Sequence, residues 1–215
     1  MDDRIDRIAI RIAADASKAD HDGKYESYSG PISYSGSDAV VENAFFSLKD
    51  GKIDWMNGTW KSGVWGGGVW HGGVWHDGTW KSGVWEKGVW QYGIWMPDDG
   101  RKSVWMKGTW KLGSWYDGTW EDGVWEYGFW KNGLWKNGIW KSGAWNDGVW
   151  EGGHHDNGEW YGGKWGDGLW NNGIWLGECD EWCGGDWKTG KDGKRTVHDD
   201  PPSKWNASDS EADER

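Results

Sequence analysis

Tryptophan recurs at every fifth residue from Trp55 to Trp175 without any shift of phase. This register contains 25 slots over 121 residues, and 23 slots hold Trp, the exceptions being Gly100 and His155. Both exceptional segments keep the length of the repeat, so we expect substitutions inside the repeat rather than inserted loops. A Gly stands three residues after each slot from Trp55 to Trp170, except at Asp98 and Ser103. The unit is therefore a WxxGx pentad, and its repetition dominates what the chain can fold into.

A period of five residues fits neither an α-helix nor one continuous strand. A Gly in every pentad would also cost a helix about 1 kcal/mol at each occurrence. Strand-forming residues precede most Trp residues, while pairs such as Asn132-Gly133 and Asp77-Gly78 favour turns. Strands this short cannot stand alone, so successive turns must hydrogen-bond to one another about 4.7–4.9 Å apart. The pattern predicts an all-β fold, a β-solenoid of stacked pentads.

The direction of the Trp side chains follows from the alternation of faces along a strand. The residue after Trp is polar in most pentads, such as Lys131 and Glu121, so it faces solvent and the Trp faces inward. The alternative is a surface ladder of exposed indoles. Inward Trp residues in a twenty-residue ring of four pentads would be crowded. The Gly two positions before each Trp would make room for the indole. We therefore predict a core ladder that contains Trp60, Trp65, Trp70, Trp75, Trp80, Trp110, Trp115, Trp120, Trp125, Trp130, Trp135 and Trp140.

The pentads from Trp55 to Trp175 resemble those of the pentapeptide-repeat family. That resemblance implies a right-handed β-helix with four faces, each built from one pentad. The likeness is one of rhythm, because the family favours Leu or Phe at the inward position and a small residue such as Ala two places before it. Here those places hold Trp and Gly.

The segments outside the repeat suggest four parts. Residues 1–20 place Ile5, Ile8 and Ile12 on one apolar helical stripe, which predicts an amphipathic helix that caps the solenoid or docks it on a larger assembly. Residues 21–38 are expected to form a linker. The solenoid is expected to span 39–187, beginning with two entry strands and a turn, and ending in a cap. Residues 188–215 are expected to be a disordered acidic tail.

Composition limits the functional classes. The formal net charge is −11, but the repeat from 55 to 175 carries only −2, with 11 basic and 13 acidic residues. Without a basic patch, binding to nucleic acid or to an anionic membrane is not expected. No membrane-spanning stretch or secretory signal is apparent. We expect the protein to reside in a virion if its source is viral, and otherwise in the cytoplasm.

Candidate chemistry in the sequence is sparse. No cluster of nucleophile, base or metal ligands converges, so we expect no enzyme and no cofactor. Cys179 and Cys183, together with His154 and His155, could be an incomplete zinc site, although the spacing equally fits a thiol pair in a capping loop. The segments that interrupt the Trp row are either local bulges or contacts for a partner. The possible partner contacts are Asp98, Asp99, Arg101, His154 and His155.

These features favour a structural rod or spacer with protein partners. Runs such as GTWKSGVW resemble the Trp/Gly arrays of structural proteins in tailed phages. That resemblance implies a tail, fibre, neck or capsid decoration component, often a symmetric homo-oligomer. One alternative is a carbohydrate- or cell-wall-binding module with exposed indoles as stacking platforms. Another is a DNA mimic that inhibits a topoisomerase, as implied by similarity to some acidic pentapeptide-repeat proteins, although outward Lys residues argue against it.

Overall fold

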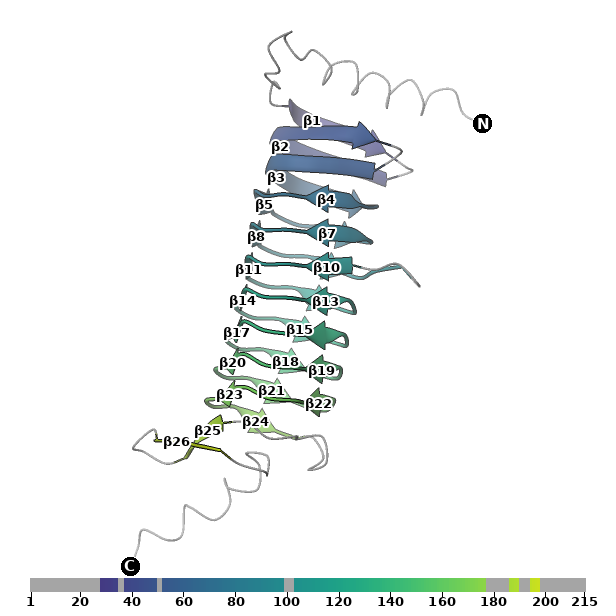
Figure 1. The fold of residues 1–215 in the computed structure, drawn as a ribbon. Helices are drawn as coiled ribbons and strands as arrows, with labels where there is room; N and C mark the ends of the chain where they lie inside the picture. The colour runs from purple at the N-terminus through teal and green to yellow at the C-terminus, as the bar shows by residue number, and fades with distance from the viewer. Residues whose placement is uncertain are drawn as a thin grey trace, which may run out of the picture.

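The computed structural model describes residues 28–34, 37–49, 52–98, 103–176, 186–189 and 194–197. All its elements are strands, which stack into a straight rod (Figure 1). Three longer strands open it: β1 (Tyr28–Tyr34), β2 (Ser37–Lys49) and β3 (Lys52–Trp65). The strands of the repeat have two or three residues each and nearly all end at the residue of the Trp slot. They are β4 (Gly68–Trp70), β5 (Val74–Trp75), β6 (Thr79–Trp80), β7 (Gly83–Trp85), β8 (Val89–Trp90), β9 (Ile94–Trp95), β10 (Ser103–Trp105), β11 (Thr109–Trp110), β12 (Ser114–Trp115), β13 (Thr119–Trp120), β14 (Val124–Trp125), β15 (Phe129–Trp130), β16 (Leu134–Trp135), β17 (Ile139–Trp140), β18 (Ala144–Trp145), β19 (Val149–Trp150), β20 (His154–His155), β21 (Glu159–Trp160), β22 (Lys164–Trp165), β23 (Leu169–Trp170) and β24 (Ile174–Trp175).

Each coil of the solenoid contains three pentads. Strands pair in parallel with the strand three pentads later, so that Trp115 of β12 lies opposite Trp130 of β15. The resemblance to pentapeptide repeats implied four pentads per coil, and the structure has three. With three indoles in each cross-section instead of four, the crowding expected for a twenty-residue ring does not arise. Eight such coils lie between Trp55 and Trp175.

Backbone hydrogen bonds join each coil to the next at two points of every pentad. The N–H after a Trp donates to the carbonyl of the Trp one coil earlier, as in Lys131 to Trp115 at 2.8 Å. The N–H before a Trp donates to the carbonyl of a corner Gly, as in Phe129 to Gly113 at 3.0 Å. These bonds satisfy the backbone groups that strands of two residues could not satisfy alone.

All 23 Trp side chains of the register are buried, with exposed fractions of 0–3%. The predicted inward direction is therefore confirmed. Indoles in successive coils stack nearly parallel, as for Trp115 and Trp130, whose ring centroids are 4.9 Å apart with an interplanar angle of 5°. Indoles within one coil meet edge to face, as for Trp125 and Trp130 at 5.9 Å and 72°. The core is thus three parallel columns of eight rings, and both contact geometries are those that aromatic rings prefer.

Some indole N–H groups donate to the backbone of the next coil. Trp55 Nε1 donates to the carbonyl of Gly72 at 3.1 Å, and Trp140 Nε1 donates to Asn157 at the same distance. Trp135 and Trp150 make the equivalent bond to the residue 17 positions later. Many other buried indole Nε1 atoms, such as those of Trp115 and Trp130, have no hydrogen-bond partner in the described part of the chain, so stacking and apolar burial of the rings must offset the cost of these polar groups.

The corner glycines are required for two reasons. Gly143 adopts a φ of +124°, which L-residues rarely adopt, and a Cβ there would lie 2.3 Å from the carbonyl oxygen of Gly128 in the coil before. The obstacle is thus mainly stacked backbone. At Gly128 an indole adds to it, because a Cβ there would lie 2.4 Å from the carbonyl oxygen of Gly113 and 3.1 Å from Trp125. An Asp before a corner Gly often accepts a bond from its N–H, as Asp147 does from Gly148 at 2.7 Å.

The two exceptional slots have different structures. His155 occupies a true core position, as expected for a substitution. The expectation for Gly100 was wrong. Trp85 pairs with Trp105, 20 residues later, and Trp95 meets Trp105 edge to face at 6.1 Å, as neighbouring Trp residues do within a coil. One extra pentad therefore leaves the coil between Trp95 and Ser103.

The ends differ from the middle. β1, β2 and β3 form an antiparallel sheet, and Phe46 of β2 stacks on Trp55 at 5.7 Å, which closes one column. The entry strands were expected, but β1 lies inside the segment expected to be a linker. At the other end, β25 (Asp186–Thr189) pairs with β23 and β26 (Lys194–Val197) pairs with β25, partly inside the expected disordered tail. The predicted helix at 1–20, with Ile5, Ile8 and Ile12, and the remainder of the tail lie outside the described residues.

Candidate functional site

The predicted partner contacts fall in different environments. Asp98 opens the extra pentad, where its N–H donates to the carbonyl of Lys81 at 3.1 Å and its carboxylate pairs with the Lys81 Nζ at 3.2 Å. His154 is exposed on β20. His155 is completely buried, so it cannot touch a partner as predicted. Asp99 and Arg101, like Cys179 and Cys183, lie outside the described residues.

His155 is buried because it follows the same inward alternation as the Trp residues. Its ring centroid lies 3.9 Å from that of Trp170 and 6.1 Å from that of Trp140. The space between Trp140 and Trp170 is therefore about as large as two ordinary ring-stacking distances. The smaller imidazole of His155 lies closer to Trp170 within it. Burial lowers the pKa of His155 from 6.5 to about 3, and the backbone of Asn172 and of His155 itself offsets this only in part.

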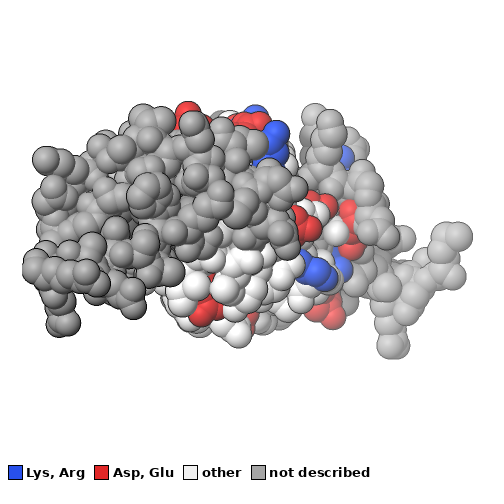
Figure 2. All heavy atoms as spheres, turned by 90° about the horizontal axis from the view of Figure 1, so that it is seen from below, with Lys and Arg blue, Asp and Glu red and all other residues white. Residues whose placement is uncertain are grey.

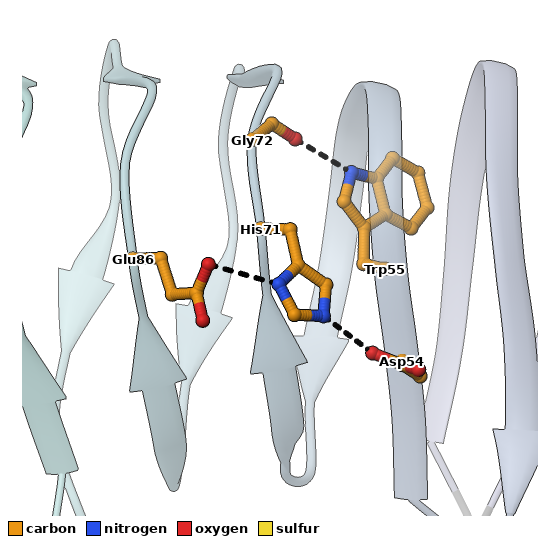
Figure 3. A network of polar contacts seen from close by, with 5 residues as sticks. All are labelled: Asp54, Trp55, His71, Gly72 and Glu86. Atoms are coloured by element: carbon orange, nitrogen blue, oxygen red, sulfur yellow. Dashed lines mark hydrogen bonds and ion pairs between the residues drawn. The ribbon is translucent and has the colours of Figure 1, made fainter.

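A second histidine bridges three coils on the surface (Figure 3). His71 Nε2 lies 2.7 Å from a carboxylate oxygen of Asp54, and its Nδ1 lies 2.9 Å from one of Glu86. Partial burial on its own lowers the pKa of His71, but the hydrogen bonds and charges of Glu86 and Asp54 outweigh it, so the pKa is raised. Both imidazole nitrogens are engaged by carboxylates of the neighbouring coils, so the cluster links three successive coils.

Other outward side chains also pair along the rod, because identical positions recur 15 residues apart. Lys136 Nζ lies 2.9 Å from Glu121, and Lys141 Nζ lies 3.5 Å from Glu126. In the end-on view, acidic and basic side chains of the described residues likewise lie next to each other (Figure 2). Surface pairs of this kind contribute little stability individually, so their main effect is to neutralise the surface.

Two hollows on the described surface differ in their lining. The first, about 570 Å³, follows one edge of the rod and is lined by exposed Tyr92, Leu112, Tyr127 and Phe129, with Ser142 and Ala144 further along. The second, about 700 Å³, is lined by charged and small residues, including Asp117, Glu121 and Lys136, and by no aromatic side chain. The sequence reasoning missed the first hollow. The sequence does contain an indication of this hollow, because large residues stand two places after Trp90, Trp110 and Trp125. These positions could be recognised as neighbours in three successive coils only once the coil length was known.

Within the described residues, no three His, Cys, Asp or Glu side chains gather in a way that could hold a metal ion. The same part of the chain contains no helix that is both long and apolar enough to cross a membrane. No protein-family model, curated protein or solved structure matches the chain.

Proposed function

We propose that this protein is a non-enzymatic structural rod or spacer that joins a larger assembly through its N-terminal segment. The observation that supports this best is the continuous core of three indole columns through eight coils, in which every register Trp is at most 3% exposed. Such a core holds each coil against its neighbours through stacked rings and backbone bonds alike. Bending the rod would require all of these contacts to shear, which suits a part that keeps two attached objects at a fixed spacing.

The scale of the rod refines this proposal. Eight coils at about 4.8 Å each give a length of roughly 40 Å. A repeat of more than 100 residues thus forms only a short rod. For a spacer of this length, the stiffness of the rod and the surface along its sides are more important than the distance that it spans. The paired charges along the rod keep its sides close to neutral, which allows approach to other proteins without strong repulsion.

The more specific part of the proposal is that the assembly is a virion, with this chain in the tail, fibre, neck or capsid decoration. It rests on the resemblance of the Trp/Gly pentads to structural proteins of tailed phages. Under this proposal the partners are other virion proteins and further copies of the same chain, since closed symmetry is the usual arrangement of homo-oligomers.

Two alternatives fit the described residues less well. A carbohydrate-binding module built on indole ladders requires exposed indoles, and the 23 register Trp residues are buried. A topoisomerase inhibitor that mimics DNA requires rows of carboxylates along the rod. Lys residues interrupt these rows, as Lys136 does after Glu121 and Lys141 after Glu126.

Rigidity is testable by a distance measurement between spin labels. Ser62→Cys and Asn172→Cys place labels at equivalent corner positions of the first and last coils, in a chain with Cys179→Ser and Cys183→Ser. Seven steps of about 4.8 Å predict a single narrow distribution near 34 Å. A broad distribution would contradict a stiff spacer.

Attachment is testable by truncation. A chain that lacks residues 1–20 is expected to retain the melting transition of the rod while losing the ability to join the assembly that captures the intact chain. If the truncated chain joins that assembly equally well, attachment lies elsewhere and the proposal fails in this respect.

A further inference from the structure

The first hollow described above, which we call the tyrosine groove, runs along one edge of the rod from the coil of Tyr92 to that of Ile174. Four corner glycines form its floor: Gly113, Gly128, Gly143 and Gly158. The side chains before and after each Gly form its two walls. Because the solenoid repeats its geometry in every coil, the groove is a straight channel suited to an elongated ligand.

The walls of the tyrosine groove are aromatic at one end and mostly small and polar at the other, where the exposed Ile174 is the large apolar side chain. Tyr92 and Tyr127 are 54% and 57% exposed, and Phe129 is 38% exposed. Further along, Ser142 and Ala144 leave the channel open, and Asn157 and Glu159 add polar groups. A Tyr ring offers an apolar face together with a hydroxyl that remains hydrated, so these walls suit a ligand that is itself both apolar and polar.

The charges narrow the ligand class. Glu159 is the one groove-lining residue that is charged at neutral pH, and the Tyr161 hydroxyl already donates to its carboxylate. No cationic side chain lines the groove, so nothing there compensates the charge of a phosphate or a sulfate. A nucleic acid or an anionic glycan is therefore disfavoured, and a neutral ligand is favoured.

The floor argues against an extended peptide. Peptides that bind along β-structure gain affinity from unpaired backbone groups at a strand edge. Here the glycine carbonyls already accept bonds within the solenoid: Gly113 from Phe129 at 3.0 Å, and Gly143 from Glu159 at 2.8 Å. A peptide would find no backbone edge, and recognition must come from side chains that stack and hydrogen-bond.

We propose that the tyrosine groove binds a neutral linear oligosaccharide. Pyranose rings present C–H faces that stack on the rings of Tyr92 and Tyr127, and a rim of hydroxyl groups that hydrogen-bonds to Ser142, Asn157 and Glu159. A chain of equatorially linked sugars is straight, as the groove is. This inference does not depend on the rod function, since a rigid rod could lack a ligand and a ligand-binding chain could serve another role.

Calorimetric titration of the full chain tests the inference, with cellohexaose and chitohexaose as straight neutral probes and a heparin-derived hexasaccharide as the anionic probe. We expect at least one neutral probe to bind and the anionic probe not to bind. Tyr127→Ala and Tyr92→Ala should each weaken binding by about tenfold or more, because each removes a stacking ring. Tyr127→Phe should retain most of the affinity, since it keeps the ring.

The matched control is Tyr116→Ala. Lys131 Nζ lies over the Tyr116 ring, 5.1 Å from the ring centroid, and Tyr116 does not line the groove. This substitution should therefore leave the affinity for the oligosaccharide unchanged. The proposal is overturned if neither neutral probe binds, if the anionic probe binds more tightly, or if binding survives both Tyr→Ala variants. Unchanged melting temperatures would establish that Tyr92→Ala and Tyr127→Ala are folded, as expected because both side chains are more than half exposed.

Discussion

At the scale of single residues, the stability of this fold is concentrated at Trp. Trp130 has stacked partners in the coils before and after it, Trp115 at 4.9 Å and Trp145 at 4.7 Å, and edge-to-face partners in its own layer. Trp130→Ala removes all of these contacts and leaves a hole that rigid neighbouring coils cannot fill. We expect a loss of about 3–5 kcal/mol in the free energy of unfolding, measured by guanidinium denaturation.

The control for Trp130 is Tyr127→Ala on the adjacent corner, which should change stability by less than about 0.5 kcal/mol because Tyr127 is largely exposed. Equal effects of the two substitutions would mean that the indole columns do not hold the rod together.

His155 makes the rod sensitive to acid in a way that the Trp slots are not. Its folded pKa of about 3 lies below the unfolded value of 6.5, so acid protonates the unfolded chain first. The stability associated with neutral His155 is therefore complete above pH 6.5 and is lost progressively as the pH falls toward 3. Well below pH 6.5 the free energy of unfolding falls by about 1.4 kcal/mol per pH unit. The loss between pH 6.5 and 4.5 is roughly 2–3 kcal/mol.

His155→Trp should remove this dependence and add stability, because an indole fills the height left between Trp140 and Trp170. The comparison is the difference in unfolding free energy between the variant and the natural chain at pH 7 and at pH 4.5. The difference in unfolding free energy should be larger at pH 4.5 than at pH 7. The contributions of other titrating groups, His71 included, are the same in both chains and cancel from this difference. A difference that stays constant between the two pH values would show that His155 is not buried as a neutral ring.

The corner glycines give a third test at this scale. Gly143→Ala forces a Cβ into the carbonyl of Gly128 at a φ of +124°, so it should destabilise the rod by more than the 1 kcal/mol or so of an ordinary glycine replacement. Gly152→Ala is the matched control. Its φ is not in the positive range, and the nearest atom to its Cβ would be the carbonyl oxygen of Lys136 at 3.6 Å. Similar melting temperatures for the two variants would contradict the stacked corner geometry.

At the scale of elements, the extra pentad after Trp95 is separable from the coil. The core contacts on either side, Trp95 to Trp105 and Trp85 to Trp105, already have the geometry of adjoining pentads. Deleting residues 97–101 together with Ser103→Gly leaves the sequence WMKGVW, an ordinary WxxGx pentad with Gly at the corner. Because a shorter connection also lowers the entropy cost of ordering the chain, we expect a melting temperature equal to or above that of the intact protein.

The comparison for this deletion is the removal of residues 121–125, which also takes out five residues but lies inside a coil. It moves every later pentad to the next face, removes Glu121, the partner of Lys136, and separates Lys131 from Tyr116. If removing 97–101 proved the more damaging change, the extra pentad would have to be part of the coil after all.

The same elements show how far sequence reasoning reaches. The period of five, the strand and corner positions and the inward direction of Trp all followed from local rules of alternation and turn chemistry. The number of pentads per coil did not, because every pentad is nearly identical and any whole number keeps Trp inside. For the same reason the interruption at Gly100 was interpreted as a substitution: an inserted pentad preserves the phase of a five-residue repeat, and only the pairing of Trp85 with Trp105 distinguishes the two cases.

The candidate sites follow the same logic. A surface feature such as the tyrosine groove depends on residues 15 positions apart, or 20 across the loop, so it is invisible until the coil length is fixed. His155 was misjudged because histidine is usually polar surface, whereas in a strict repeat the slot determines burial and the residue type must accommodate it.

At the scale of the whole molecule, the structure places 23 indoles inside one continuous core, which makes the intrinsic fluorescence a direct report on the fold. We expect a blue-shifted emission that is poorly quenched by acrylamide, because the register indoles are inaccessible to solvent and to quencher. Guanidinium should convert it to a red, readily quenched emission in one steep transition, since each coil depends on both neighbours for its hydrogen bonds and ring contacts. The control is Trp130→Ala, which should shift the midpoint to lower denaturant concentration while leaving the native emission maximum blue. A red native emission would mean that the indoles face solvent. The rod would then lose the core on which its rigidity depends.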